Sequence, residues 1–561
     1  MGTVKDKIRE HLQSGQYHEA AEHMKKNLHG EIPLLSSDPD YCILAASAFL
    51  QAGDPEIAFD VITMGLLADN KNYELFLLLG EYYFDSNPDK ALICFYQAMY
   101  NCNDENDRAV IDGMLDAALE RGAHVRPVSI VVVRDGNLQA TERCIESIEN
   151  TVPEFLYGLI QVDPGESNGS PGYVKACNEG IRKSDPGSDV LLLDCNSMLI
   201  ENSLFYLMLG LYDRKEVGIV GAVTNNPSTG QGMEVDVSDL DKALQNVLTV
   251  NSPLRNAYEK RAYVSDFAML IKREVIEKIG LFDEALDPAS LEDRDYGIRA
   301  VMEGYSVCLC HNSFVFNIGE NGLKCTVGDE IHKRNHKLLK SKWHFDVGYS
   351  GVIRSPLIDM IREDEDTPFN VLEIGCALGS TLSRIQYKYP CSKVWGIEYD
   401  SAVVKVAENV LDIIRGDAET MDIPYREQQF DYIICADVLE HLRNPEGAIK
   451  RFLPYLKKDG YFLVSLPNIR HFGVLMMLLL EGRFDYQDSG ILDSTHLKFF
   501  TLATAREMLE NCGLEVLEVE RNHNCEEDKN DFVRRLEENF DVKDSDEMMV
   551  FQYYFLAKKR G

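Results

Sequence analysis

The feature that most constrains the fold lies between residues 371 and 379, where an apolar run turns into a glycine loop. The run 371–374 leads into the pattern E-x-G-x-x-x-G, which comprises Glu373, Gly375 and Gly379. Glycines at a strand-to-helix turn let the backbone pass close to a ligand at the start of the helix. The pattern predicts a parallel α/β domain with a ligand site at the carboxyl ends of its strands.

Three further markers follow in the order that an adenosine-containing cofactor requires. Glu398 ends the apolar run 393–397, and a carboxylate there can accept the protons of both ribose hydroxyls. Asp417, within 416–419, can reach the adenine amine. The run 430–441 predicts a buried strand whose polar residues gather at its C-terminal end. Four markers in sequence are much more specific than one glycine motif.

Residues 350–561 resemble the class I S-adenosylmethionine-dependent methyltransferases. The D-V-L-E-H-L string at 437–442 is similar to the methyl/ubiquinone-type branch, and the strings 482–486 and 490–501 to a subgroup found with surface-glycan enzymes. Ala377 stands where the family often has glycine. The resemblance implies a Rossmann-like fold and S-adenosylmethionine as cofactor. The cofactor-binding residues that it implies are Glu373, Gly375, Cys376, Gly379, Glu398, Tyr399, Asp417, Ala418 and Asp437.

Two histidines are the candidate catalytic bases of this domain. His441 follows the strand-end cluster, and His496 precedes a helix expected to cover the acceptor side. A hydroxyl nucleophile needs such a base to accept its proton. Asp437, Glu440 and His441 also match an acid-x-x-Glu-His arrangement that some ubiquinone-pathway O-methyltransferases use for a divalent ion. The alternative is that Glu440 caps a helix or pairs with Arg443 on its surface.

Length and charge bound the remaining possibilities. A chain of 561 residues is longer than one hydrophobic core normally supports, so three or four domains are expected. The net charge of −35 argues against nucleic acid or an anionic membrane as partner. The start has no apolar signal core and the apolar run near 474–480 is too short to span a bilayer, so we expect a cytoplasmic protein without a transmembrane segment. The 14 cysteines form no C-x-x-C pair, so we expect reduced packing residues.

Residues 1–122 predict helical hairpins with an internal repeat. Small and aromatic residues recur at a period of about 34 residues, as Gly80 follows Ala46 and Tyr83 follows Phe49. This segment resembles tetratricopeptide repeats. The resemblance implies a concave face that holds a protein or peptide partner, and the alternative is a module for packing or dimerisation.

A second α/β domain is expected from residue 128 onward. The run 128–133 is rich in β-branched residues without alternation, which is typical of a buried parallel strand. Further runs lie at 159–162, 189–193 and 218–223, with helical stretches between them. Polar residues follow several of these runs, among them Asp163 and the triplet from Asp194 to Asn196.

Residues 126–345 resemble family 2 glycosyltransferases of the GT-A fold. The strings 271–284 and 335–343 carry most of the resemblance, together with the acidic string 291–295. It implies a nucleotide-sugar donor, with Asp163 on the base, Asp194 on the ribose and Asn196 within the donor site. Asp293 would deprotonate the acceptor hydroxyl.

Three departures from that family lie in one site. The family's D-x-D usually ends in a metal-binding aspartate, where this chain has Asn196, and Asn317 replaces a later histidine. The opening turn has become Arg134-Asp135-Gly136. An amide oxygen is a weaker ligand than a carboxylate for a hard cation, so any dependence on Mg²⁺ or Mn²⁺ should be weak. Arg134 or another basic residue would then face the diphosphate of the donor. The alternative is a catalytically degraded sugar-binding domain.

The sequence therefore predicts a multidomain α/β protein with helical repeats at 1–122, a GT-A domain at 126–345 and a methyltransferase domain at 350–561. The runs 514–519 and 548–556 should form the antiparallel pair that completes a seven-stranded sheet, around an acidic segment at 526–546. The expected function is sugar transfer plus methylation of a glycan, with a glycan, lipid-linked or protein acceptor such as flagellin. The alternatives are a methyltransferase alone and a non-enzymatic scaffold of a glycan-modification complex.

Overall fold

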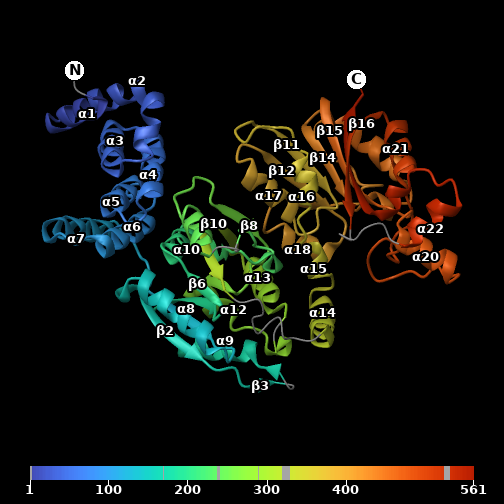
Figure 1. Cartoon of the computed structure of the whole chain (residues 1–561), viewed down its shortest axis with the longest axis horizontal. Coiled ribbons are helices and arrows are strands. Elements are labelled where there is room, and N and C mark those ends of the chain that lie inside the picture. The colour runs from blue at the N-terminus through green and yellow to red at the C-terminus, as the bar shows by residue number, and fades with distance from the viewer. Residues whose placement is uncertain are drawn as a thin grey trace. The chain divides into compact units, whose positions relative to one another are not determined.

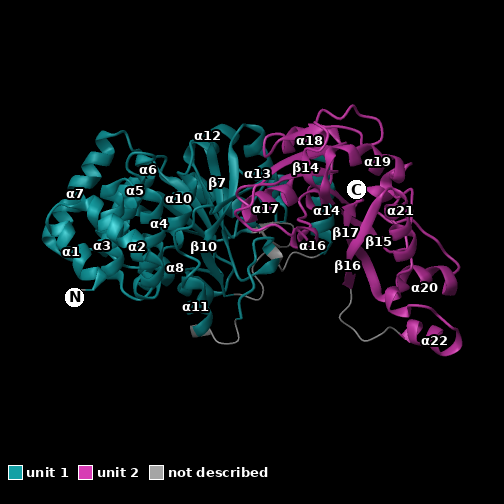
Figure 2. Cartoon of the chain, turned by 90° about the horizontal axis from the view of Figure 1, so that it is seen from above, with its two compact units in different colours: residues 1–342 teal, residues 343–561 magenta. Residues whose placement is uncertain are grey.

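The structure is a computed structural model of the chain and describes residues 3–167, 170–236, 240–288, 290–318, 329–523 and 531–560. The chain divides into two compact units, residues 1–342 and 343–561 (Figure 2). The first unit joins the N-terminal helices to an α/β region, and the second is an α/β domain of its own. The three domain boundaries at 122, 126–345 and 350 stay predictions.

Helical hairpins open the first unit. They are α1 (Val4–Gln13), α2 (Tyr17–Leu35), α3 (Pro39–Ala52), α4 (Pro55–Ala68), α5 (Tyr73–Tyr83), α6 (Pro88–Asn101) and α7 (Glu105–Glu120). Each helix contacts the next, and α3 also contacts both α1 and α5, so the hairpins stack in a row (Figure 1). Their membership of the tetratricopeptide repeats stays a prediction.

Short-range signals set where the hairpin helices begin and how closely they pack. Asp38 and Asn87 cap α3 and α6 through their side chains, and each precedes a proline at the first helical turn. Two glycines permit close helix contacts, because a Cβ at Gly65 would lie 2.6 Å from Leu75 Cδ1 and one at Gly80 would lie 2.2 Å from the Phe95 ring. The small residues at these positions therefore serve packing.

The α/β region of the first unit follows α7. Its strands are β1 (Val128–Val133), β2 (Tyr157–Val162), β3 (Glu166–Ser167), β4 (Ser170–Pro171), β5 (Asp189–Asp194), β6 (Ser197–Leu199), β7 (Val217–Val223), β8 (Tyr258–Arg261), β9 (Ala268–Ile271) and β10 (Ser306–Asn317). Its helices are α8 (Leu138–Thr151), α9 (Tyr173–Lys183), α10 (Ser203–Leu211), α11 (Leu240–Leu248), α12 (Arg273–Ile279), α13 (Glu292–Met302) and α14 (Asp329–Trp343).

The main sheet of this region is mixed, with the order β2-β1-β5-β9-β7-β10-β6 and β8 paired to β10. Strand β1 is fully buried and lies parallel to both β2 and β5. The predicted strands at 128–133, 159–162, 189–193 and 218–223 are confirmed as β1, β2, β5 and β7. Because β1, β2 and β5 are parallel, their carboxyl ends share one edge of the sheet.

The helical hairpins and the α/β region share one hydrophobic core. Helix α10 is buried on all sides, and its Phe205 ring meets Phe76 of α5 edge to face with centroids 5.1 Å apart. The Asn87 side chain also donates to the carbonyl oxygens of Tyr212 (2.9 Å) and Asp213 (3.0 Å). Part of the face of the hairpins is therefore used for packing within the chain.

The second unit carries strands β11 (Asn370–Ile374), β12 (Lys393–Glu398), β13 (Ile413–Arg415), β14 (Phe430–Ala436), β15 (Leu456–Pro467), β16 (Leu514–His523) and β17 (Val550–Lys559). Its helices are α15 (Val347–Ser350), α16 (Ser355–Asp359), α17 (Ser380–Lys388), α18 (Ser401–Ala407), α19 (Pro445–Phe452), α20 (Phe472–Leu480), α21 (Leu502–Asn511) and α22 (Asp531–Asn539).

These strands form a seven-stranded sheet in the order β13-β12-β11-β14-β15-β17-β16. The first five are parallel, whereas β17 runs antiparallel to β15 and to β16. The predicted antiparallel pair is thus confirmed: β16 extends four residues beyond the predicted end, and β17 begins two residues later and ends three residues later than predicted. In the acidic segment α22 forms a helix, and residues 526–530 lie outside the described residues.

Candidate functional site

The glycine loop of the second unit connects β11 to α17 in a left-handed conformation. Gly375 and Gly379 have φ values of +71° and +77°, and Ala377 between them has φ 47°. A residue with a side chain is strained there, which explains a preference for glycine at this position. The Ala377 amide donates to Glu398 Oε2 at 2.9 Å, so one hydrogen bond holds the strained residue in place.

Glu398 ties two loops together at the end of β12. Besides the Ala377 amide, its carboxylate accepts the Asp400 amide at 2.8 Å. Burial raises the pKa of Glu398, and the backbone donors oppose that rise. The adjacent Tyr399 is exposed. Binding of the ribose by Glu398 stays a prediction, and it would use the lone pairs that the two amides leave.

Asp417 organises the turn after β13. Its Oδ1 accepts the Glu419 amide and its Oδ2 accepts the Thr420 hydroxyl, both at 2.9 Å. The next residue, Ala418, is buried. The structure thus places Asp417 on the same sheet edge as Glu398, because β13 pairs in parallel with β12.

Glu373 is a buried carboxyl group beneath the glycine loop. Desolvation raises its pKa to about 8, and Arg354 opposes the rise. Among the described residues its Oε2 has no hydrogen-bond partner. An unpaired buried carboxyl beside a glycine cradle fits a cationic ligand, because a positive charge would offset the desolvation of the carboxylate. Cys376 is buried in the same loop.

Asp437 is held by three side chains from other elements. Its carboxylate pairs with Arg354 Nη2 at 2.9 Å, accepts the Ser465 hydroxyl at 2.5 Å and accepts the Gln552 amide. Asp437 itself has φ 54°. These partners orient the carboxylate at the end of β14, where the sequence predicts a cofactor contact.

Glu440, His441 and His496 lie together next to this carboxylate. One ligand atom from each lies within 4.8 Å of the others. His496 Nδ1 lies 2.9 Å from the Ile491 carbonyl oxygen, and His441 Nδ1 lies 3.0 Å from Thr495 Oγ1. The Ile491 carbonyl oxygen can only accept, so His496 donates through Nδ1–H. Thr495 donates its own hydroxyl proton to Asp493 at 2.6 Å, so His441 Nδ1–H is the donor to the Thr495 oxygen. Their Nε2 atoms are then acceptors.

The chemistry of this cluster follows from its acceptors. Burial lowers the pKa of His441, with His496 adding to the effect, so His441 is neutral and able to take a proton at neutral pH. Burial and the Asp437 charge raise the pKa of Glu440, whose Oε2 has no hydrogen-bond partner in the described part of the chain. The three residues could serve as a proton acceptor or hold a divalent metal ion. The predicted alternative, in which Glu440 pairs with Arg443 on a helix surface, is wrong because the Glu440 side chain is buried.

In the first unit, the predicted donor-site residues meet at the carboxyl ends of β1, β2 and β5. Asn196 is buried, and its Nδ2 donates to Asp135 Oδ2 at 2.8 Å and to Asp194 Oδ1 at 3.1 Å. Asp163 is exposed and pairs with Arg134. The Asn196 amide therefore bridges two carboxylates, and the Arg134 guanidinium is engaged by the carboxylate predicted to bind the nucleotide base.

Two further residues of this unit, Asn317 and Tyr173, belong to segments that adjoin the donor-site residues. The carbonyl oxygen of Asn196 accepts the Ile318 amide at 2.8 Å, which brings the Asn317 segment beside the triplet. Tyr173 is fully buried, and burial raises its pKa well above its usual range, with the charges of Asp194 and Glu292 adding to that rise. Tyr173 is the first residue of α9.

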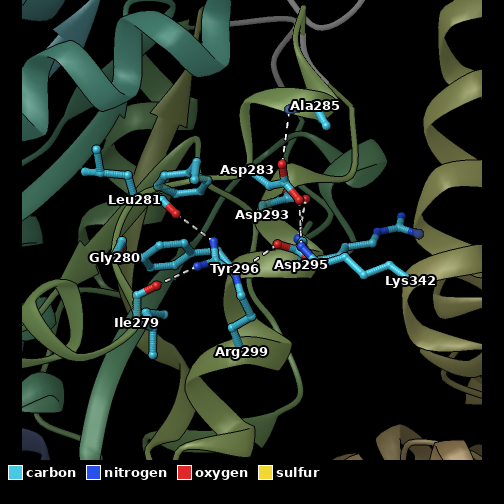
Figure 3. Close-up of polar contacts among 12 residues, drawn as sticks. Ile279, Gly280, Leu281, Asp283, Ala285, Asp293, Asp295, Tyr296, Arg299 and Lys342 are labelled. Carbon is cyan, nitrogen blue, oxygen red and sulfur yellow. Dashed lines mark hydrogen bonds and ion pairs between the residues drawn. The ribbon is translucent and has the colours of Figure 1, made fainter.

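Asp293 lies in the first turn of α13 (Figure 3). Its neighbour Asp295 is buried and bound to Arg299 Nε and Lys342 Nζ, both at 2.9 Å. Lys342 also reaches Asp283 at 2.7 Å. Asp293 is partly exposed, and its Oδ1 accepts the Arg294 amide at 2.8 Å. Of these acids, Asp295 serves the packing of α13, whereas Asp293 is accessible to an acceptor.

Two family models match the chain in these regions. Residues 101–328 match a model described as glycosyltransferase like family 2, and residues 350–519 match one described as a methyltransferase domain. These matches support a glycosyltransferase family 2-like domain and a methyltransferase domain in one chain. The resemblances to both families are thereby confirmed, as is the fold class, with its helical N-terminal region, GT-A-like region and Rossmann-like domain. The scaffold alternative loses its support.

Two curated relatives are methyltransferases by name. A malonyl-[acyl-carrier protein] O-methyltransferase from Priestia megaterium is 28% identical over 145 residues, which are 23% of this chain and 52% of the relative. A ubiquinone biosynthesis O-methyltransferase from Rickettsia bellii is 22% identical over 210 residues, which are 34% of this chain and 85% of the relative. The chain thus spans about half the length of the first of these relatives.

Solved structures also align with the chain. A SAM-dependent methyltransferase from Archaeoglobus fulgidus is 19% identical, with 40% of this chain and 99% of that chain covered and a TM-score of 0.28. The fold of the methyltransferase domain rests on its strand order. Within the residues that the structure describes, no helix has the length and apolar character needed to cross a membrane.

Sequence reasoning missed several residues of both transferase domains. Asp135 was noted only as part of an altered turn, although it follows β1, and parallel pairing of β1 with β5 places Val133 opposite Asp194 of the triplet, which could have indicated the bridge. Arg354, Ser465 and Gln552 surround Asp437 from α16's N-cap, β15 and β17. No motif contains these three, so no local signal could have found them.

Proposed function

We propose that the chain transfers a sugar from a nucleotide-sugar donor and methylates the resulting glycan. The observation that carries this proposal is the presence of two transferase domains in one chain, each with polar residues gathered at the carboxyl ends of parallel strands. A chain that holds both can act in succession on one acceptor.

In the methyltransferase domain, bound S-adenosylmethionine supplies an electrophilic methyl group. The glycine loop and Glu398 would hold the cofactor, and buried Glu373 would face its positive charge. The methyl group would pass from the sulfonium sulfur to the acceptor oxygen, so the S–C bond would break, the neutral thioether would leave, and an O–C bond would form. The proton that the acceptor hydroxyl loses would be taken by the Nε2 atom of His441 or His496. The names of the curated relatives, both O-methyltransferases, support oxygen as the methylated atom.

In the glycosyltransferase family 2-like domain, Asp293 would take the proton of the acceptor hydroxyl. The acceptor oxygen then bonds to the anomeric carbon of the donor while the bond from that carbon to the diphosphate breaks. Asp163 and Asp194 would hold the nucleoside. We propose weak metal dependence, because the Asn196 amide already bridges Asp135 and Asp194 where a cation would otherwise neutralise carboxylates.

The acceptor would be a bacterial surface polysaccharide, a lipid-linked oligosaccharide or a protein such as flagellin. For a protein acceptor, the part of the helical hairpins that does not pack on α10 offers a docking surface. A cytoplasmic location suits this role, since nucleotide sugars and S-adenosylmethionine are cytoplasmic metabolites.

A second candidate is a methyltransferase alone, with the glycosyltransferase-like domain holding the glycan. The Asn196 bridge favours it, because an amide that is already committed to two carboxylates leaves fewer ligands for a metal-bound diphosphate.

Incubation of the purified full chain with a panel of nucleotide sugars and S-adenosylmethionine distinguishes the bifunctional enzyme from the methyltransferase-only function. Mass spectrometry should detect the released nucleoside diphosphate and a methylated, glycosylated product. Release of no nucleoside diphosphate from any donor, together with methylation of a preformed glycan, would leave the methyltransferase-only function.

A further inference from the structure

A cavity of about 390 Å³ lies where the helical hairpins pack on the α/β region of the first unit. Its volume is in the range that holds a small molecule. Helices α4, α5 and α6 line one side, and α10, β8 and β10 line the other. The lining residues that matter here are Tyr82, Tyr83, Lys90, Tyr206, Tyr258 and Asn312.

Aromatic rings form much of the cavity wall. Tyr82 of α5 meets the neighbouring Tyr83 ring at 4.9 Å and the Phe59 ring of α4 at 5.1 Å. Tyr206 and Tyr258 line the cavity from the α/β region. Ring faces of this kind give apolar contact area with little loss of side-chain freedom.

The charged residues of the lining already have partners. The Lys90 ammonium lies 2.5 Å from Asp213 Oδ1, between the rings of Tyr83 and Tyr258. Arg255 pairs with Glu56 and, at 2.8 Å, with Asp60. With both cations of the lining neutralised, the cavity offers no free charge to an anionic ligand.

Two buried polar atoms of the cavity wall lack a hydrogen-bond partner among the described residues. They are the Tyr206 hydroxyl and Asn312 Oδ1. Tyr206 is 1% exposed and Asn312 is 3% exposed. A buried polar atom without a partner has lost its hydrogen bonds to water, and a ligand hydroxyl would replace them.

We infer that this cavity binds a neutral pyranose of a glycan. The C–H face of the sugar would lie on the tyrosine rings, and its hydroxyls would bond Tyr206 and Asn312. The residues of this site are distinct from those of the predicted donor site, Asp163, Asp194 and Asn196. Binding here does not require either transferase domain to be active, so the inference goes beyond the proposed function.

The test is saturation-transfer difference NMR on the full chain with the methyl glycosides of glucose, mannose, galactose and N-acetylglucosamine. We expect saturation transfer to at least one of them. Tyr82→Ala and Asn312→Ala should each weaken its binding about tenfold, because they remove a ring face and a hydrogen-bond acceptor. Tyr82 is partly exposed, so its variant keeps the test valid where Asn312→Ala fails to fold.

Phe155→Ala is the matched control. Phe155 is an exposed ring that meets Tyr96 at 5.6 Å outside the cavity, and its loss should leave binding unchanged. Absence of transfer to all four glycosides would overturn the inference. So would binding that survives both cavity variants, that Asp194→Ala abolishes, or that the anionic methyl glucuronide matches in affinity.

Discussion

At the scale of single residues, Glu398 holds the strained Ala377 and ends the strand that carries the predicted ribose contact. We predict that Glu398→Ala weakens S-adenosylmethionine binding by about 1.5–3 kcal/mol, the usual value for hydrogen bonds to a charged group. Isothermal titration calorimetry measures the change. Glu408→Ala is the matched control, since Glu408 is exposed just after α18, and its affinity should equal that of wild type.

The raised pKa of Glu373 predicts a pH dependence of cofactor binding. The free protein holds a proton on Glu373 up to about pH 8. A cationic ligand favours the ionised form and lowers this pKa, so binding releases a proton below pH 8. Affinity for S-adenosylmethionine should therefore rise with pH towards 8, by at most about tenfold per pH unit, and level off above it.

The comparison ligand is S-adenosylhomocysteine, which lacks the sulfonium charge. Titrations at pH 6.5, 7.5 and 8.5 should show a smaller slope for it than for S-adenosylmethionine. Glu373→Gln should flatten the slope for S-adenosylmethionine. Equal slopes for the two ligands would contradict a role for Glu373 opposite the sulfonium.

Asp293 separates the two proposed activities. Asp293→Asn should lower sugar transfer by about 10²-fold to 10⁴-fold, the usual contribution of a general base. Methylation of a preformed glycan should remain at the wild-type rate, because the second unit is compact by itself. Radiolabel transfer from each donor measures both. Sugar transfer at the wild-type rate would show that Asp293 is not the base.

At the scale of elements, the turns after β1 and β5 meet through the Asn196 bridge. We predict that wild type keeps most of its sugar transfer in a chelator. Asn196→Asp places a third carboxylate between Asp135 and Asp194, which creates a strongly anionic oxygen site. This variant should bind Mn²⁺ at least tenfold more tightly than wild type in calorimetry. Complete loss of wild-type transfer on chelation, restored by metal, would refute this prediction.

The strands were predictable because each pattern is local. The glycine loop, Glu398 and Asp417 lie at strand ends that hydrophobic runs mark, and their places on one sheet edge follow from parallel pairing. The shell around Asp437 was not predictable, because Arg354 and Gln552 come from segments nearly 200 residues apart along the sequence. The burial of Glu440 was missed for the same reason, since it depends on residues that fold over it from around His496.

At the scale of the whole molecule, we predict that a ligand of one compact unit changes the thermal unfolding of that unit alone. S-Adenosylmethionine at 100 times its Kd should stabilise the second unit by about 2.7 kcal/mol. For a domain of that size the shift in Tm is roughly 5–10 °C. Differential scanning calorimetry should show one transition that moves and one that does not. Equal shifts of all transitions would contradict independent units.

Helix α10 lies buried between the hairpins and the sheet, in a core that both regions share. Loss of a hairpin that packs on α10 would expose apolar side chains of that core to water, and an inserted hairpin would have no room in it. Substitutions in these hairpins must therefore be compatible with the α/β region that they pack against. The place where genes could exchange a whole functional part is therefore the boundary at residues 342 and 343. The helices and the glycosyltransferase-like region therefore form one packing unit, whereas the methyltransferase domain packs as a unit of its own.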